Sequence, residues 1–167
     1  TSLKFFSYIY YKMVDYDTRK VKITYKGETK NIPKRYIPDS LTEREKKAQI
    51  KSIFEGTDRP KTKTRERKSK YTIKFDKTYG EALDKLKGGR SKKNIAKITG
   101  IPFKAIDEVF KIGEAAFRTS GSRPNQTPQS WGRGRLYSYI MGNPKVRKID
   151  EKITKKYKVK FKIPTEK

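Results

Sequence analysis

The excess of positive charge constrains this chain more than any other feature of its sequence. Its 167 residues include 44 Lys and Arg against 18 Asp and Glu, so the net charge is +26 at pH 7. Hydrophobic residues make up 32% of the chain, below the roughly 45–50% of an ordinary globular domain, a benchmark that also counts Gly. Aromatic residues nevertheless reach 12%, which argues against a fully disordered polyelectrolyte. We therefore expect an α+β protein with a small helical core, short strands and extended basic arms.

The residue types that are missing exclude most catalytic and metal chemistry. The chain has no Cys and no His, which removes disulfides, the usual zinc sites, thiol nucleophiles and the commonest general base. Asp107, Glu108 and Lys111 resemble a nuclease carboxylate cluster, but the two acids project about 100° apart on a helix and Lys111 follows only one of them. We therefore expect no catalytic residue, no metal site, no cofactor and no small-molecule substrate, and we predict that the protein is not an enzyme.

No apolar run approaches the roughly 20 residues of a membrane span. The longest candidate, Phe5–Tyr11, is also too short and polar for a secretory signal. We expect a soluble intracellular product without a transmembrane segment. Phe5–Tyr11 is interpreted either as a strand in the chain's own core or as a strand that docks on a neighbouring subunit. Because Met13 follows it, whether residues 1–12 are an authentic arm stays open.

The pattern along the chain predicts five segments. Val21, Ile23 and Tyr25 alternate with polar residues before Gly27, which predicts a β-hairpin returning over residues 29–32. Thr42 and Glu45 form a capping-box pattern for a helix to about residue 54. The segments are an N-terminal arm and hairpin (1–33), an extended entry motif followed by a helix (34–58), a basic extended linker (59–77), a helical core (78–142) and a basic C-terminal connection and strand (143–167). The entry motif is expected to be extended between Pro33 and Pro38.

The linker carries the densest positive charge. In an extended chain alternate side chains point the same way, about 6.6 Å apart, which is comparable with the phosphate spacing along one nucleic-acid strand. These cations are therefore candidate polyanion-binding or partner-binding residues, and a solvated linker is the alternative. The candidates here are Arg59, Lys61, Lys63, Arg65, Arg67 and Lys68.

We expect a core of three to five helices, over about 79–87, 92–99, 102–117 and 128–141. The segment 91–117 has the pattern of a helix-turn-helix hairpin, in which Ala96 permits close approach and Gly100 takes the left-handed turn. Its second helix presents Asp107 and Glu108 where base-reading residues are usually Arg, Asn or Gln. A structural hairpin is therefore favoured over a DNA-reading one.

Two further patterns each leave two interpretations open. Arg123, next to Pro124, and Arg135 flank Trp131, which indicates either an Arg–indole stack that locks a loop onto a helix or a stacking site for an unpaired base. Near the C-terminus, four apolar residues from Tyr157 to Ile163 alternate with lysines, which predicts a strand. Its charged face would protect a sheet edge or contact a polyanion, and its lysines are Lys156, Lys158, Lys160 and Lys162.

One set of residues, most of them around Trp131, forms a recognisable motif. They are Lys34–Pro38 with Leu41 and Thr42, Ile95-Ala96, Ile101, Gly113, Ala115–Phe117, Gly121, Arg123-Pro124, Trp131, Arg135-Leu136, Ser138–Ile140 and Asp150. This motif resembles an uncharacterised family found in large icosahedral double-stranded DNA viruses of algae and amoebae and in some phages. The resemblance covers roughly residues 34–60 and 90–153, with Gly134 where members commonly have Ala. It implies a viral origin and no established chemistry.

The resemblance and the charge together favour a minor capsid or internal scaffold protein that bridges capsid subunits beneath the shell. Its partners would be the major capsid protein and other minor capsid proteins, with non-specific contact to genomic DNA. It would lie in the capsid interior of the virion, and in the host cytoplasm or nucleus during assembly. The alternative is a Lys-rich nucleic-acid-binding protein that is packaged with the genome or condenses it.

Overall fold

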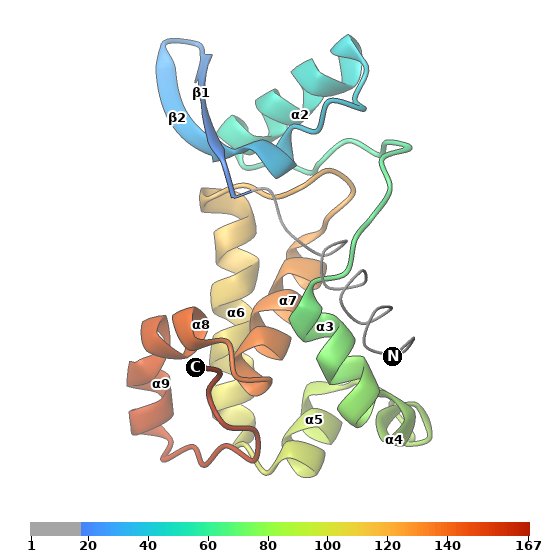
Figure 1. The fold of residues 1–167 in the computed structure, drawn as a ribbon, viewed down its shortest axis with the longest axis vertical. Helices are drawn as coiled ribbons and strands as arrows, with labels where there is room; N and C mark the ends of the chain where they lie inside the picture. Colours follow the sequence, from blue (N-terminus) through green and yellow to red (C-terminus); the bar gives the residue numbers. More distant parts are fainter. Residues whose placement is uncertain (1–17) are drawn as a thin grey trace, which may run out of the picture. The chain divides into compact units, whose positions relative to one another are not determined.

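The computed structural model describes residues 18–167, and the predicted strand Phe5–Tyr11 lies outside them (Figure 1). The fold is α+β, as expected, with many helices and one small two-stranded sheet. The chain forms two compact units. The first combines the part up to Arg67 with Arg118–Thr127, and the second combines Lys68–Phe117 with Pro128–Lys167. The division after Arg67 falls inside the predicted linker 59–77, and residues 118–127, predicted as helical core, belong to the first unit.

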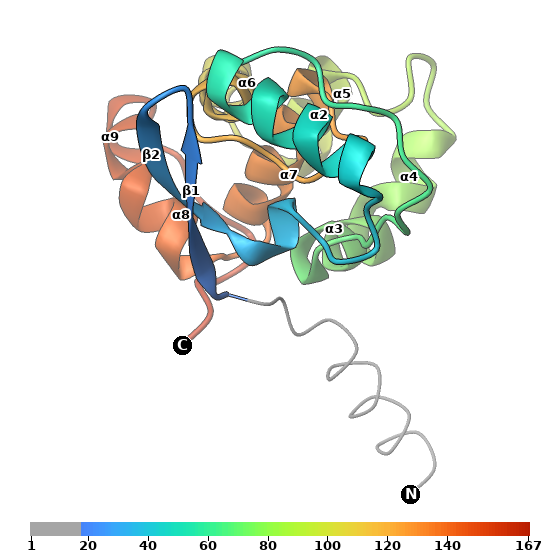
Figure 2. The same cartoon turned by 90° about the horizontal axis from the view of Figure 1, so that it is seen from above.

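The first unit contains the predicted hairpin. Strand β1 (Lys20–Tyr25) pairs antiparallel with β2 (Glu28–Pro33), and Tyr25 lies opposite Glu28. The two connecting residues, Lys26 and Gly27, both have positive φ, 47° and 82°, the geometry of the tight turn that matches the twist of a hairpin. The hairpin lies beside helix α2 (Glu43–Glu55) (Figure 2).

Helix α2 begins and ends where its sequence predicts. The Thr42 side chain accepts from the Glu45 backbone N–H, the Glu45 carboxylate accepts from the Thr42 N–H, and Gly56 ends the helix with φ 66°. The prediction of an extended chain between Pro33 and Pro38 is wrong, because Lys34–Tyr36 forms a short 3₁₀ helix, η1. Its turn is closed by a bond from Ile37 N–H to the Lys34 carbonyl, which places the Tyr36 ring in the core.

In the second unit, the predicted helix 79–87 begins nine residues earlier. Helix α3 (Lys70–Phe75) continues through a π-helical turn, η2 (Asp76–Gly80), into α4 (Glu81–Asp84). The prediction of an extended chain to residue 77 is therefore wrong beyond Ser69, whose hydroxyl caps α3 by accepting from the Thr72 N–H. Apolar side chains recur every fourth residue, which drifts about 40° per step on a 3.6-residue helix. The wider π turn absorbs this drift and keeps one buried face: Tyr71, Phe75, Tyr79 and Leu83.

The helix-turn-helix hairpin is confirmed as a structural unit. Helix α5 (Lys92–Thr99) is capped by Ser91, and Gly100 follows it with φ 73°. Helix α6 (Phe103–Thr119) begins directly after Pro102. Ala96 packs against the core of this unit, to which both helices contribute buried side chains. This core consists of Tyr71, Phe75, Tyr79, Leu83, Ile95, Ile101, Ala105, Ile106, Val109, Leu136, Tyr137, Tyr139, Ile140, Met141, Ile153 and Val159.

Helix α7 (Pro128–Ile140) has the predicted bounds and crosses α6 in backbone contact. A Cβ added at Gly113 would lie 2.7 Å from the Gly132 Cα, and one added at Gly132 would lie 2.9 Å from the Phe110 carbonyl oxygen. Such distances exclude any side chain at this crossing. Gly113 therefore sets how closely the two longest helices of the second unit approach.

The C-terminal prediction is wrong in both parts. Residues 144–156 form two short helices, α8 (Pro144–Ile149) and α9 (Glu151–Lys156), because the Asn143 side chain caps the first helix and Pro144 suits its first position. The following residues form no strand: Lys158 lies in a turn with φ 50°, residues 162–163 form a bend, and Val159 is buried between exposed lysines. The apolar and charged residues alternate because one side of the chain lies on the core. A strand also needs a hydrogen-bonded neighbouring strand, which this segment lacks within residues 18–167.

Within residues 18–167, no helix combines the length and the apolar composition needed to cross a membrane.

Candidate functional site

Four of the predicted polyanion-binding residues form one exposed row in the first unit. From Lys61 to Arg65 the burial alternates, so that the cations are exposed while Thr62 and Thr64 are half-buried. Within the described residues, the side chains of this row make no ion pair or hydrogen bond. We call this row the basic strip, and it consists of Lys61, Lys63, Arg65 and Arg67.

Arg59, predicted to belong to this row, is instead buried. Its exposed fraction is 6%, and its guanidinium donates to the Ser122 hydroxyl (2.9 Å) and to the carbonyls of Ser52 (2.9 Å) and Thr57 (2.6 Å). Burial lowers the pKa of Arg59 from its ordinary value, against the attraction of Tyr36 and Asp58. Arg59 is therefore an anchor at the start of the strip rather than a contact for a partner.

The loop after α6 holds the strip at two further points. The Asn125 side-chain oxygen accepts from the Thr62 N–H (2.6 Å), and its amide nitrogen donates to the Thr62 hydroxyl (3.1 Å). The Arg123 guanidinium donates to the Arg67 carbonyl (2.7 Å). We call Ser122, Arg123 and Asn125 the clamp. Because the clamp bonds two backbone groups, the Thr62 hydroxyl and the buried Arg59, it fixes the path of the strip without neutralising any of its four cations.

The clamp loop is itself fixed to α2. The side-chain amide of Gln49, fully buried, donates to the Ser122 carbonyl (2.9 Å) and to the Tyr36 carbonyl (3.0 Å). Gly121 has φ 83°, and a Cβ there would lie 2.9 Å from the Ile53 side chain. Pro124 is buried beside them. The Gly-x-Arg-Pro pattern seen in the sequence thus supports the basic strip.

The remaining predicted cations, all in the second unit, do not form a second row. Lys68 pairs with Asp76 (3.1 Å), Lys156 pairs with Glu108 (2.9 Å), and Lys162 donates to the Ile98 carbonyl (3.1 Å). Lys158 and Lys160 are exposed. The predicted four-lysine strand face is wrong because these residues share no strand, and three of the five cations already have partners.

Two acids of helix α6, Asp107 and Glu108, are also paired. Asp107 lies between Lys111 (2.8 Å) and Lys92 (2.7 Å), and its pKa is lowered by hydrogen bonds from these two ammonium groups, against a small opposing effect of burial. Glu108 accepts from Lys156 and from the Tyr157 hydroxyl. These carboxylates hold α5, α6 and α9 together. Among residues 18–167, no group of three acidic side chains is placed to hold a metal ion.

Arg135 makes a buried ion pair. Its guanidinium donates twice to Asp150, from Nε (2.9 Å) and from Nη2 (2.7 Å), and the Asp150 side chain is 2% exposed. The pair joins α7 to the junction of α8 and α9. Trp131 is half-buried on the same helix, and its predicted stacking against arginine or a base stays a prediction.

Sequence reasoning missed Arg147, a buried cation without a carboxylate partner. It donates to the carbonyls of Tyr139 (2.8 Å), Ile140 (2.9 Å) and Ile163 (2.8 Å), and its guanidinium lies 3.6 Å from the centre of the Phe161 ring. The last carbonyls of α7 would otherwise lack donors. Burial lowers the pKa of Arg147 from its ordinary value. The only signal in the sequence was the apolar run Tyr139–Met141 at the end of α7.

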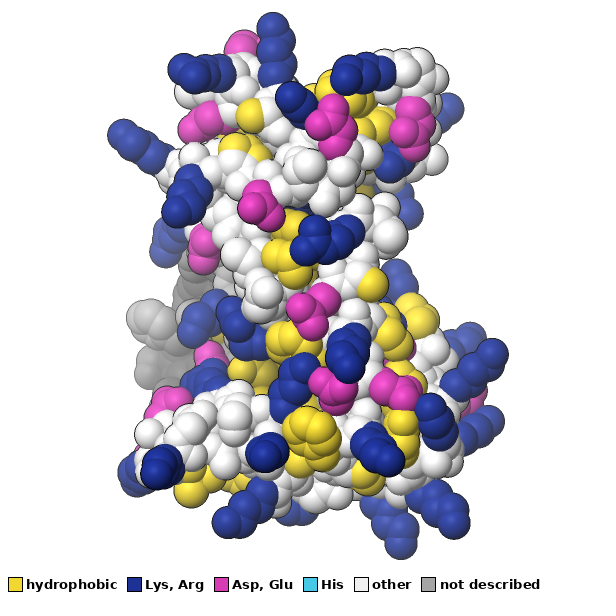
Figure 3. All heavy atoms as spheres, turned by 180° about the vertical axis from the view of Figure 1, so that it is seen from behind, with side chains coloured by type: hydrophobic (Ala, Val, Ile, Leu, Met, Phe, Trp, Pro, Cys, Tyr) yellow, Lys and Arg dark blue, Asp and Glu magenta, His cyan; other side chains and the backbone are white. Residues whose placement is uncertain are grey.

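Figure 3 shows Lys and Arg side chains scattered over the viewed face, with Asp and Glu side chains among them. Charge is therefore not gathered into one patch on this face. Other exposed lysines, such as Lys158 and Lys160, also lack partners within residues 18–167. The basic strip differs from them by its alternating order on a backbone that the clamp fixes.

Comparison with known proteins places the chain in a family. No curated protein and no solved structure matches it. A family model described as "Family of unknown function (DUF5824)" matches residues 28–158. The matched region includes the basic strip, the clamp and the Arg135–Asp150 pair. Because the match spans well over half of the sequence, the chain belongs to this family, DUF5824, whose function is unknown.

Proposed function

We propose that the protein is a non-enzymatic structural protein that binds the phosphate backbone of nucleic acid through the basic strip, without reading base sequence. The observation that carries this proposal is the strip itself: four exposed cations in a row, without acidic partners, on a backbone that the clamp holds in place.

The arrangement suits a regularly spaced polyanion. Alternate residues of an extended chain lie about 6.6 Å apart, and a nucleic-acid strand presents phosphates at a comparable and regular spacing. Because the clamp orders the strip before a ligand arrives, binding costs less conformational entropy than it would for a flexible lysine-rich tail. Lys61 and Lys63 act as point charges, which favours adhesion over base readout.

Helix α6 supports the same conclusion because its first turns lack the usual base-reading residues. Its first turns present Asp107 and Glu108 rather than Arg, Asn or Gln, and both acids are engaged by lysines of the same unit. A helix with this surface does not suit the major groove. Adhesion through the strip therefore accounts for binding without a recognition helix.

A minor capsid or internal scaffold protein is the second candidate. The resemblance to proteins of large icosahedral DNA viruses favours a virus particle as the setting. In that setting the basic strip would adhere to acidic faces of the major capsid protein or of other minor capsid proteins. This role predicts a location in the capsid interior, and the genome-binding role predicts a location on the packaged DNA.

The first test is the salt dependence of binding to a short duplex DNA, measured by fluorescence anisotropy. If all four cations of the strip contact phosphates, log K should fall against log salt with a slope of about −3.6, since each contact contributes about −0.9. Changing the strip to glutamine at all four positions should remove most of this slope.

A matched control separates the strip from net charge. Four exposed lysines elsewhere in the same unit, changed to glutamine together, lower the net charge by the same amount, and they are Lys20, Lys22, Lys47 and Lys51. We expect this variant to keep most of the slope. If both variants lose the slope equally, binding is general attraction to a +26 chain and the proposal is wrong.

The second test separates the two candidates. Purified virus particles are emptied of nucleic acid, and the protein is measured by quantitative mass spectrometry in the shells and in the released material. Release with the genome supports nucleic-acid binding, whereas stoichiometric retention in empty shells supports the capsid role.

A further inference from the structure

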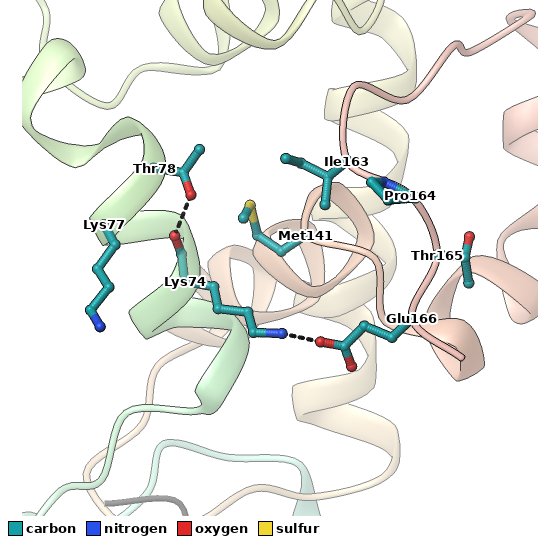
Figure 4. Close-up of a pocket in the computed structure, with 8 residues that line it drawn as sticks. All are labelled: Lys74, Lys77, Thr78, Met141, Ile163, Pro164, Thr165 and Glu166. Carbon is teal, nitrogen blue, oxygen red and sulfur yellow. Dashed lines mark hydrogen bonds and ion pairs between the residues drawn. The ribbon is translucent and has the colours of Figure 1, made fainter. Parts of the chain in front are cut away.

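Three donors from helix α3 converge on one carboxylate near the C-terminus. The Glu166 side chain accepts from the Lys70 ammonium (3.0 Å), from the Tyr71 hydroxyl (2.7 Å) and from Lys74. Figure 4 shows Lys74 pointing at Glu166, while Lys77 points away from the pair. We call Lys70, Tyr71 and Lys74 the α3 triad.

The α3 triad is built to hold an anion. Lys70 and Lys74 are four residues apart on a helix, so their charges repel each other unless an anion lies between them. Their ammonium groups lie 4.9 and 5.7 Å from the centre of the Tyr71 ring, so the ring packs beside both. Burial raises the pKa of Glu166, but hydrogen bonds from Lys74, Tyr71 and Lys70 outweigh it and lower that pKa to about 2.

Glu166 can leave the triad without detaching the C-terminal segment. Its backbone N–H donates to the Gly142 carbonyl (2.9 Å), and a Cβ on Gly142 would lie 2.5 Å from the Pro164 carbonyl oxygen. The segment is therefore packed onto the end of α7 through its backbone. The Glu166 side chain is 25% exposed, so it lies at the surface and needs only a rotation to enter solvent.

An open pocket of about 380 Å³ adjoins the triad. Met141, Ile163 and Pro164 supply apolar lining, and Lys74 and Glu166 lie at its edge (Figure 4). A ligand held by the triad would therefore have room for an adjoining uncharged part, such as a sugar, against an apolar wall. This is what a nucleic-acid backbone presents on either side of each phosphate.

We propose that the α3 triad is a second phosphate-binding site for a nucleic-acid backbone, and that Glu166 occupies it in the free protein. This inference rests on the proposed function, and it names a contact outside the basic strip. Glu166 imitates the ligand's charge, keeps the two lysines in place and must be displaced for the phosphate to bind. It thereby lowers affinity for anions and suppresses weak binding.

The test compares two variants that each remove one negative charge. Glu166→Gln leaves the triad without its anion, whereas Glu114→Gln changes a side chain of α6 that makes no ion pair or hydrogen bond within the described residues. With duplex DNA as the probe, Glu166→Gln should steepen the salt slope by about 0.9 to 1.8, for one or two new phosphate contacts. Glu114→Gln should leave it unchanged. Adding Lys70→Gln to Glu166→Gln should reverse part of the gain.

A second readout separates this inference from the proposed function. If the unmodified protein does not bind DNA, the proposed function fails, and inorganic phosphate becomes the probe in thermal unfolding. Phosphate should then raise the melting temperature of Glu166→Gln more than that of Glu114→Gln, because a ligand of the folded state stabilises it. If the two variants respond alike to DNA, or alike to phosphate where DNA does not bind, the inference is overturned.

Discussion

The two units use their positive charge in opposite ways. Among the described residues of the first unit, the basic strip is held without any carboxylate, by the amide of Asn125, the hydroxyl of Ser122 and the guanidinium of Arg123, and its cations stay unpaired. In the second unit several helices are joined by ion pairs between a lysine or arginine and a carboxylate, as in Arg135–Asp150 and Lys92–Asp107. The placement of the few acids, rather than the number of cations, therefore decides which of these cations are paired.

The largest effect is expected at the buried pair of the second unit. Asp150→Asn leaves the Arg135 guanidinium without its anion, and removing one partner of a buried pair costs about 3–5 kcal/mol. Urea unfolding followed by circular dichroism measures this free energy. Glu151→Gln is the control at the next position. It breaks an exposed pair with Lys155 and should change stability by less than about 1 kcal/mol. Equal effects would show that acids are not structural in this unit.

The next effect tests the crossing of α6 and α7. Gly113→Ala places a Cβ 2.7 Å from the Gly132 backbone, which forces the helices apart at a cost of about 1–3 kcal/mol. Gly134→Ala, on α7, meets nothing within 4 Å and should stabilise the helix by about 0.5–1 kcal/mol. Thermal unfolding of both variants should move the melting temperature in opposite directions. A loss of stability in both would contradict the prediction.

A smaller effect on folding stability is expected when the pH is lowered and Glu166 is protonated. Its pKa falls from the ordinary value of 4.5 to about 2 in the folded protein, so its contribution to stability is present above 4.5 and is lost as the pH falls toward 2. After discounting for solvent screening we expect about 1–2 kcal/mol. Urea unfolding between these pH values should show the advantage of the unmodified protein over Glu166→Gln shrinking. A constant difference would show that the triad does not hold the carboxylate.

The smallest effect sharpens the role of the clamp. Asn125 has φ 64°, so Asn125→Gly keeps its backbone conformation while it removes both bonds to Thr62. The strip keeps every cation but loses one attachment, and DNA affinity should fall by about 1 kcal/mol because ordering is then paid on binding. Anisotropy at one salt concentration measures this. Unchanged affinity would mean that the strip needs charge but not order.

Local signals in the sequence predicted much of the fold. The capping box at Thr42, the left-handed Gly100 and Pro128 at the start of α7 all act within a few residues, so helix bounds could be read from them. The segment after Tyr157 could not, since whether an alternating extended chain becomes a strand depends on a neighbour far away in the sequence. The start of α3 was missed because its charged run concealed the cap at Ser69.

The candidate site was predicted in part. The alternation of the strip was visible, and Lys61 and Lys63 are exposed as expected. Nothing local distinguished Arg59 from them, because its burial depends on Ser122, 63 positions away. The α3 triad was equally invisible, since Glu166 is 92 positions from Lys74. Long-range partners decide which cations are available, and a single sequence does not display them.

Arg147 has a consequence for how the second unit opens. One guanidinium joins the end of α7 at Tyr139 and Ile140 to the C-terminal segment at Ile163. Separating that segment would leave three carbonyls and a buried cation without hydrogen-bond partners at once. The amide protons near residue 163 should therefore exchange with solvent in step with those of α7, as one cooperative unit.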